Sequence, residues 1–289
     1  MVAPARVLAM SVASAKHIVD ELIEERAPGW VAKPYWPLIK PALYRILDYG
    51  KAVRMADAIR PLGGTEALAY ISDLLALKVV ASGVERVPST GRLIIILNHP
   101  TGVADGVAVY DALKRVRPDL CFFANADAFR VCPGFADVLI PVEWVEEKRT
   151  REKTRLTLQL ARAALEAERA IAIFPAGRLA RRRGGVIADP PWAPSALSLA
   201  RKYEAPIAPA HLSGPHPTLF HLFDRFSAEL RDITLFHELL NKRGDRFDLA
   251  IGPLIPPAAL EGEEASAVTL RLKRYIEREL VRDPDRAFA

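Results

Sequence analysis

Short apolar runs that alternate with helical segments, from residue 81 onward, constrain the fold of this chain more than any other feature. The runs combine β-branched, aliphatic and aromatic residues, which is typical of buried strands. They are RLIIILN (92–98), DLCFFAN (119–125), DVLIPV (137–142), RAIAIFP (169–175), APIAPAH (205–211) and FDLAIG (247–252). Helix candidates lie between several of them, and strands that alternate with helices form a sheet covered on both faces. The pattern predicts an α/β fold with a mostly parallel or mixed central sheet flanked by helices.

The first part of the chain differs, because its apolar residues recur at helical spacing. The segments PLIKPALYRILDYGKAVRMADAIR (37–60) and EALAYISDLLALKVV (66–80) both have this pattern, and the second includes Val79. We therefore divide the chain into an N-terminal helical region, residues 1–80, and a main domain, residues 81–289.

Two interpretations of the helical region stay open. It can be a helical layer packed on the main domain, or an amphipathic surface that rests on a bilayer. In the second interpretation, Trp30, Tyr35 and Trp36 are interfacial aromatic residues beside Lys33 and Lys40. Both interpretations can hold at once, so contact with a membrane surface is one of our expectations for this region.

The charge balance limits the classes of partner that the protein can bind. The chain has 40 Lys and Arg residues against 35 Asp and Glu, which gives a net charge of +5 and a pI near 9.2. This excess suits an anionic membrane surface or a phosphorylated substrate, but it is too weak to predict nucleic-acid binding. No apolar run reaches the roughly 20 residues of a membrane span, and the two cysteines, Cys121 and Cys132, form no disulfide pattern. We expect a cytoplasmic protein that is peripheral on the inner face of the cytoplasmic membrane.

The stretch LIIILNHPTGVADG (93–106) places a histidine directly after an apolar run and a carboxylate shortly beyond it. Pro100 and Gly102 predict a turn at His99 and put Asp105 in the first turn of the next helix. If the turn folds back, Asp105 can accept a hydrogen bond from one ring nitrogen and make the other nitrogen a better base. Free backbone N–H groups of the same helix start would then stabilise an oxyanion. The alternative is a capping aspartate beside an unrelated histidine.

A second polar segment follows the fourth apolar run. FPAGR (174–178) closes that run, and three more arginines come next, Arg181, Arg182 and Arg183. Guanidinium groups bind phosphate through paired hydrogen bonds. We therefore predict a phosphate-binding role for at least one of these arginines, with Arg178 as the first choice because it adjoins the strand end. The alternative is a solvated basic loop, which is common for such charge runs.

The order of these motifs resembles the PlsC-type glycerolipid and phospholipid acyltransferase family. NHPTGVADG, IFPAGRLAR and APIAPAH stand in the family's order, and the resemblance extends from about residue 80 to about residue 220. Five residues separate His99 from Asp105, which is similar to a hemolysin-like branch of the family with the motif N-H-P-x-G-x-x-D-G. Ala176 stands where better-known members have a glutamate associated with acceptor binding, which again resembles that branch.

The resemblance implies roles for individual residues. His99 would be the general base and Asp105 the carboxylate that orients it. The donor would be acyl-CoA or an acyl-carrier protein, the acceptor a lysolipid or a glycerophosphate-like molecule, and neither a cofactor nor a metal ion would be needed. The residues that would bind the substrates are Asn98, Gly102, Phe174, Pro175, Gly177, Arg178, Arg181 and, at the end of its strand, Pro209.

Two rival functions stay open. A thioesterase or another hydrolase that uses the same dyad would transfer the acyl group to water. A non-catalytic, membrane-associated protein would not need the dyad. The chain has no G-x-S-x-G motif, so a serine hydrolase would lack its usual nucleophile. We therefore predict an O-acyltransferase of the phospholipid or glycerolipid type.

Overall fold

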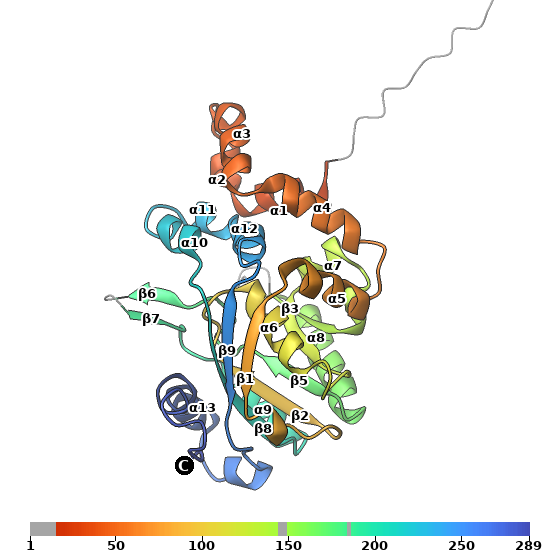
Figure 1. Ribbon diagram of the computed structural model, residues 1–289, viewed down its shortest axis with the longest axis vertical. Coiled ribbons are helices and arrows are strands. Elements are labelled where there is room, and N and C mark those ends of the chain that lie inside the picture. Colours follow the sequence, from red (N-terminus) through yellow and green to blue (C-terminus); the bar gives the residue numbers. More distant parts are fainter. Residues whose placement is uncertain (1–15, 144–148, 184–185) are drawn as a thin grey trace, which may run out of the picture.

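A seven-stranded sheet lies between layers of helices in a computed structural model, which describes residues 16–143, 149–183 and 186–289 (Figure 1). The strand order is β1-β9-β8-β2-β5-β3-β4. β8 and β9 are antiparallel, and every other neighbouring pair is parallel. The predicted α/β class with a mostly parallel or mixed sheet is confirmed. The strands of this sheet are β1 (Lys78–Ser82), β2 (Leu93–Leu97), β3 (Cys121–Asn125), β4 (Leu139–Val142), β5 (Ala170–Ile173), β8 (Ile207–Ser213) and β9 (Arg246–Ile251).

A short antiparallel hairpin, β6 (Arg181–Arg183) with β7 (Val186–Ala188), stands apart from this sheet. Helices precede the sheet and connect its strands. They are α1 (Ile18–Arg26), α2 (Pro28–Val31), α3 (Trp36–Ile46), α4 (Tyr49–Ile59), α5 (Gly64–Leu75), α6 (Val103–Leu113), α7 (Asp127–Val131), α8 (Arg151–Glu166), α9 (Ser195–Lys202), α10 (Thr218–Phe223), α11 (Ala228–Asp232), α12 (Leu235–Leu240) and α13 (Ala265–Arg274), which continues as a π-helical turn, Tyr275–Glu279.

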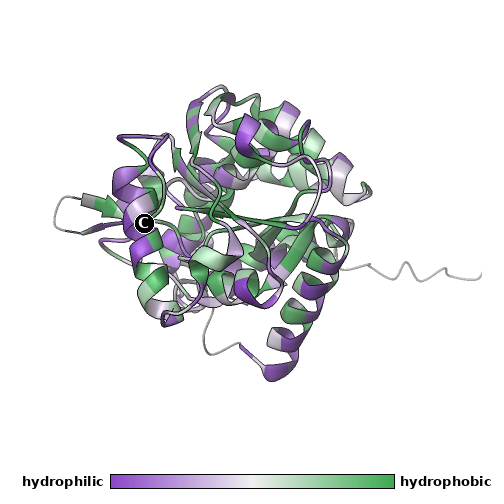
Figure 2. Ribbon diagram, turned by 90° about the horizontal axis from the view of Figure 1, so that it is seen from below, coloured by the Kyte–Doolittle hydropathy of each residue, from purple (hydrophilic) through white to green (hydrophobic). Residues whose placement is uncertain are grey.

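β2 lies at the centre of the sheet and is buried on both faces. Leu93, Ile95 and Leu97 face the layer that contains α5 and α6, whereas Ile94 and Ile96 face the layer of α8, α9 and α13. Successive side chains of a strand point to opposite faces, so a strand covered on both sides needs an uninterrupted apolar sequence. Figure 2 shows the hydrophobic segments concentrated in the sheet and on the helix surfaces turned toward it.

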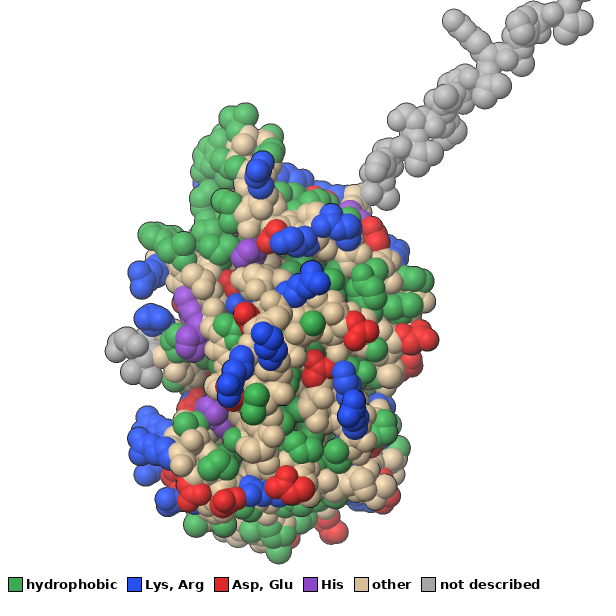
Figure 3. Space-filling view, viewed as in Figure 1, with side chains coloured by type: hydrophobic (Ala, Val, Ile, Leu, Met, Phe, Trp, Pro, Cys, Tyr) green, Lys and Arg blue, Asp and Glu red, His purple; other side chains and the backbone are tan. Residues whose placement is uncertain are grey.

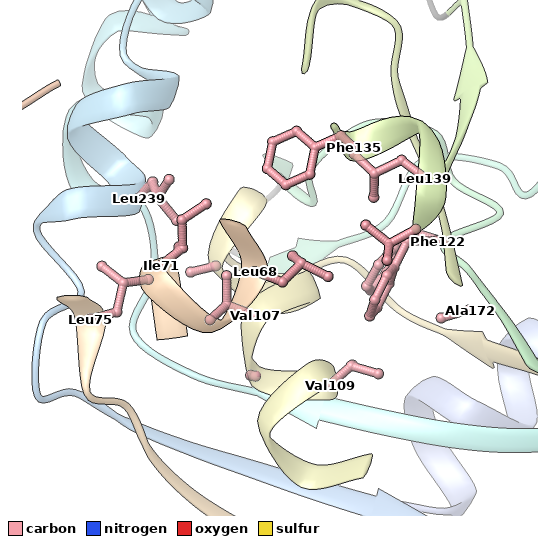
Figure 4. Close-up of a cluster of buried hydrophobic side chains, with 14 of the residues drawn as sticks. Leu68, Ile71, Leu75, Val107, Val109, Phe122, Phe135, Leu139, Ala172 and Leu239 are labelled. Atoms are coloured by element: carbon pink, nitrogen blue, oxygen red, sulfur yellow. The ribbon is translucent and has the colours of Figure 1, made fainter. Parts of the chain in front are cut away.

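The packing of α5, α6 and α12 fixes the helix that carries the predicted carboxylate. Leu68 and Ile71 of α5, Val107 of α6 and Leu239 of α12 belong to one buried cluster, with Phe122 of β3 at its other side (Figure 4). Fully burying an aliphatic side chain of this size contributes roughly 1.5–3 kcal/mol. This packing therefore holds α6, and with it the residues at its start, in a fixed position on the sheet.

The helix predicted over 66–80 is too long. α5 ends at Leu75, and Ala76 follows in the left-handed conformation (φ 43°), which stops the helix. Val79 lies in β1, which pairs in parallel with β9, so its assignment to a helix is wrong and the boundary drawn at residue 80 falls inside a strand. The local pattern could not show this, because the partner strand lies far away in the sequence.

The helix predicted over 37–60 is divided in two. Asp48 takes the left-handed conformation (φ 54°) between α3 and α4 and turns the chain there. α1 is tied to this corner through Asp20, which accepts a hydrogen bond from Tyr44 (2.9 Å) and pairs with Lys40 (3.2 Å). The N-terminal helices therefore hold a defined arrangement.

The predicted interfacial aromatic residues are only partly on the surface. Trp36 is 5% exposed, so its placement at a membrane interface is wrong. Trp30 is partly buried and donates its ring N–H to Ser227 Oγ (3.1 Å), whereas Tyr35 is 44% exposed. None of the helices that the structure describes is both long and apolar enough to span a membrane.

Candidate active site

Three neighbouring strands end beside the predicted dyad. β8, β2 and β5 lie side by side and run parallel, and Ile96 of β2 pairs with both Ile173 of β5 and Pro209 of β8. The segments that leave these strands therefore meet at one edge of the sheet, where ligands bind in open α/β folds. The position predicted for the site, just beyond the end of β2, agrees with this arrangement.

The predicted contact between His99 and Asp105 is present. His99 Nδ1 lies 2.8 Å from Asp105 Oδ2, and the two side chains are 16% and 0% exposed. Asp105 also accepts hydrogen bonds from the N–H groups of Thr101 (3.0 Å) and Gly102 (3.1 Å), and from the Thr101 hydroxyl. The carboxylate thus caps α6 and contacts the imidazole at the same time, so the two interpretations of the motif are combined in one residue.

Gly102 makes this turn sterically possible. Its φ of 108° is in the region that favours glycine, and a Cβ atom there would lie 2.9 Å from Leu179 Cδ2. The N–H groups of Thr101 and Gly102 are not available to an oxyanion, because both donate to Asp105. The turn uses them to hold the carboxylate, since a buried charge needs several donors. The use of N–H groups in the first turn of α6 to bind an oxyanion stays a prediction.

Asn98 connects the end of β2 to β8. Its amide group donates to the carbonyl of Leu212 (2.8 Å) and accepts the Leu212 N–H (2.8 Å), and the residue is 7% exposed. What the structure shows for Asn98 is therefore the alignment of two strand ends; the predicted contact with substrate stays a prediction.

Residues after β5 hold His99 from the opposite side. The Phe174 ring stacks on the imidazole with 4.5 Å between ring centres, and the Ala180 N–H donates to the His99 carbonyl (2.9 Å). Asp189 accepts the His99 N–H with both carboxylate oxygens, at 3.1 and 3.2 Å. No local pattern predicted this contact, because Asp189 lies 90 residues beyond His99 in the chain.

The FPAGR segment forms a tight turn. Gly177 has a φ of 63° and donates its N–H to the Phe174 carbonyl (2.9 Å), while the Pro175 carbonyl accepts from Ala193 (3.0 Å). Arg178, the first choice for a phosphate ligand, is exposed at this edge. The structure therefore places Phe174 against the dyad and gives Pro175 and Gly177 roles in the turn.

Arg181 is partly buried in a basic environment. Its Nε atom is buried and hydrogen-bonds to no described residue. Burial lowers the pKa of Arg181, and the positive charges of Arg231 and Arg178 lower it further, although Asp224 opposes them. The guanidinium group thus lacks a full set of protein partners.

Two histidines after β8, the second of them in α10, were not among the predicted site residues. His216 and His221 lie with ring centres 6.3 Å apart, and both ring nitrogens of His221 are buried with no described hydrogen-bond partner. Burial lowers the pKa of His221, and the nearby His216 and Arg182 add to this effect. Figure 3 shows histidine side chains next to Lys and Arg side chains in this region. Within the described ranges, no group of three potential ligands could hold a metal ion.

The predicted position of Pro209 at a strand end is wrong. β8 continues to Ser213, and Pro209 lies inside it, buried beside Gly252. Proline is tolerated there because its carbonyl, which accepts from the Gly252 N–H (2.9 Å), faces the chain just beyond the end of β9. The nitrogen of Pro209, which carries no hydrogen, faces the same side. No hydrogen bond between β8 and β9 is lost there, because β9 has already ended at Ile251.

The chain is similar to known acyltransferases. Residues 78–213 match the family model named Acyltransferase. The lyso-glycine lipid O-acyltransferase of Phocaeicola vulgatus is 28% identical over 202 residues, which cover 67% of this chain and 70% of that protein. The protein of the same name from Bacteroides thetaiotaomicron is 24% identical over 247 residues, or 82% and 88% of the two chains. The crystal structure of the 1-acyl-sn-glycerophosphate acyltransferase PlsC from Thermotoga maritima covers 87% of this chain and 95% of its own, with 16% identity and a TM-score of 0.48. The family model and the two relatives together support an enzyme of the acyltransferase class.

Proposed function

We propose that this acyltransferase moves a fatty acyl group from acyl-CoA or acyl-carrier protein to a hydroxyl group of a lysolipid acceptor, with His99 as the general base. The observation that carries the proposal is the 2.8 Å contact between His99 Nδ1 and the buried Asp105 at the edge of the sheet. The names of the two relatives, both lyso-glycine lipid O-acyltransferases, support a lysolipid with a free hydroxyl as the acceptor class.

The proposed reaction needs no covalent acyl-enzyme. Asp105 accepts from Nδ1, which leaves Nε2 of His99 to take the proton from the acceptor hydroxyl. The hydroxyl oxygen attacks the thioester carbonyl, and the tetrahedral oxyanion then expels the thiolate, which receives the proton back from His99. We assign the N–H groups of Val103 and Ala104, in the first turn of α6, to the oxyanion. A general base contributes typically 10²–10⁴-fold to such a rate.

We assign the anionic part of a substrate to the arginines after β5. Arg178 is exposed at the carboxyl edge of the sheet, and the unpaired, buried Nε of Arg181 adds a second donor. Guanidinium groups recognise phosphate and carboxylate groups alike. Either the headgroup of the acceptor or the phosphates of coenzyme A suit this position.

The lipid acceptor would be reached from a membrane surface. We define the apolar rim as the exposed apolar side chains of α3 and of the residue directly before it, together with those of α10 and the turn that follows it. α2 connects these two parts, because Trp30 bonds to Ser227. In Figure 3 hydrophobic side chains gather over α3 and over α10 and α11. The members of the apolar rim are Tyr35, Leu38, Ile46, Leu222 and Phe226, of which Leu38 is 80% and Phe226 is 76% exposed.

The test is transfer of a labelled acyl chain by the purified protein. Acyl-CoA and acyl-carrier protein are offered in turn with a panel of lysolipids, for the wild type, His99→Ala and Asp105→Asn. We expect ester formation by the wild type and a loss of about 10²–10⁴-fold in kcat for His99→Ala. His17→Ala is the matched control, since this histidine caps α1 and its loss should leave kcat unchanged.

Two outcomes contradict the proposal. Transfer that survives His99→Ala at the wild-type rate removes the general base. Release of free fatty acid at the same rate with and without acceptor identifies a hydrolase instead of a transferase.

A further inference from the structure

A single segment, the connection between β5 and α9 (residues 174–194), holds His99 at three points. The Phe174 ring stacks on its imidazole, the Ala180 N–H binds its carbonyl, and Asp189 binds its N–H. Both polar groups of the His99 main chain are therefore occupied by this segment. Ala180 and Asp189 stand immediately before and after the β6/β7 hairpin, so the base of the hairpin rests on the catalytic turn.

Asp189 is itself fixed on all sides. It is 7% exposed, and its Oδ2 accepts the ring N–H of Trp192 (2.9 Å) as well as the His99 N–H. Its own N–H donates to Oε1 of Glu277 in the π-helical turn (3.2 Å), and Glu277 pairs with Lys273 of α13 (2.5 Å). A carboxylate held in this way cannot move unless the main chain of His99 moves with it.

We propose that Asp189 is a positioning residue of the acyl transfer: it fixes the main chain of His99, so that the imidazole stays on Asp105 with Nε2 toward the acceptor hydroxyl. The inference rests on the proposed function, because a fixed imidazole affects the rate only if His99 is the base. A carboxylate is the group required here, since two N–H donors, from His99 and Trp192, converge on it and it has no hydrogen of its own. An asparagine would turn an NH₂ group toward one of these donors.

The electrostatics of Asp189 agree with a role that is not simply packing. Burial raises the pKa of Asp189 to about 6, against an ordinary value of 3.8; Glu277 raises it too, whereas the Trp192 N–H and His99 lower it. Because the folded-state pKa is the higher one, the resulting contribution to stability is present below 3.8 and is lost as the pH rises through about 6. The folded protein is therefore less stable when Asp189 is ionised, above about pH 6, and the chain nevertheless has a carboxylate at this position.

The test compares kcat of the wild type and Asp189→Asn across the pH range, with the donor and lysolipid that the wild type uses in the transfer assay described above. At pH 8 we expect Asp189→Asn to be slower by about tenfold or more with little change in KM, because misplacing a catalytic group lowers the rate of the chemical step. The ratio of the two kcat values should approach one below about pH 6, where Asp189 of the wild type is itself protonated.

A second variant keeps the carboxylate and changes only its titration. Trp192→Phe removes the N–H that lowers the pKa of Asp189, so this pKa should rise. We expect kcat of Trp192→Phe near the wild-type value at high pH, with its loss on acidification beginning at a higher pH. A residue that acts only through packing would not shift the profile in this way.

The matched control is Asp119→Asn. Asp119 binds Arg117 (2.6 Å) and the N–H of Ala170 (3.2 Å) at the amino end of β5, away from the dyad, so its loss should lower stability and leave kcat unchanged. A wild-type to Asp189→Asn ratio that is one at pH 8, or that does not vary with pH, overturns the role of Asp189.

A readout without turnover separates this inference from the proposed function. Nitrogen-15 spectra of labelled protein report the tautomer of His99, assigned by its absence in His99→Ala. We expect one fixed tautomer in the wild type and a mixture in Asp189→Asn at pH 8; identical spectra contradict the positioning role. If the wild type transfers no acyl group while its spectrum changes on Asp189→Asn, the proposed function fails and the structural coupling stands.

Discussion

At the scale of single residues, the site depends on how completely Asp105 is satisfied. The carboxylate has no exposed surface, and Thr101 binds it twice, through its N–H and its hydroxyl. Gly102 supplies a third donor, and His99 is the remaining partner. Because the other partners fix both oxygens, the imidazole finds its acceptor in one place only.

Thr101→Val tests this requirement with a side chain of nearly the same shape. It leaves one oxygen of a buried carboxylate without its hydroxyl donor, which costs roughly 1–3 kcal/mol. We expect a lower melting temperature and a kcat reduced by about tenfold, measured by calorimetry and acyl transfer. Thr269→Val is the control: its hydroxyl is also buried and donates to a main-chain carbonyl, that of Ala265 (2.7 Å), in α13. An equal loss of kcat in both variants would refute a special role for Thr101.

At the scale of elements, the turn between β2 and α6 combines opposite conformational demands. β2 must be extended and apolar to fill the centre of the sheet, whereas α6 must begin within a few residues so that Asp105 faces back toward His99. Gly102 resolves this with a backbone conformation that residues with a Cβ rarely adopt (φ 108°). The glycine therefore determines where the dyad forms.

Gly102→Ala, directly before α6, and Gly106→Ala, inside α6, form a matched pair. Alanine at 102 meets both an unfavourable φ and the Leu179 side chain at 2.9 Å, so we expect a loss of stability of about 1–3 kcal/mol and a large loss of kcat. Alanine at 106 meets nothing within 4 Å inside a helix and should stabilise the protein by roughly 0.5–1 kcal/mol. Denaturant unfolding measures both values; equal effects would show that the turn geometry is unimportant.

At the scale of the whole molecule, one stretch of chain, from β8 through α10, joins the catalytic edge of the sheet to the apolar rim. β8 leads into α10, and the turn after α10 carries Phe226 next to the contact between Ser227 and Trp30. The chain that leaves the site therefore continues directly to the surface that we assign to the membrane.

Replacing Leu38 and Phe226 by serine tests the apolar rim. Both side chains are largely exposed, so folding should not change. Sedimentation with anionic phospholipid vesicles should fall by about tenfold or more, since burial of one such side chain contributes roughly 1.5–3 kcal/mol. Leu158→Ser with Leu270→Ser removes two exposed apolar residues outside the rim and is the control. Equal vesicle binding by both double variants would exclude the rim as the contact surface.

The alternation of strands and helices could be predicted from the sequence, as could the positions of His99, Asp105 and FPAGR, because these depend on patterns within a few residues. The sequence did not reveal β1 or the anchoring of His99 by Asp189, and it placed Pro209 at the wrong point of its strand. Each of these depends on pairing between segments far apart in the chain, as in β1 with β9 and Asp189 with His99. Local propensity cannot specify such partners, since the free energy that selects them comes from contacts made only when the sheet has assembled.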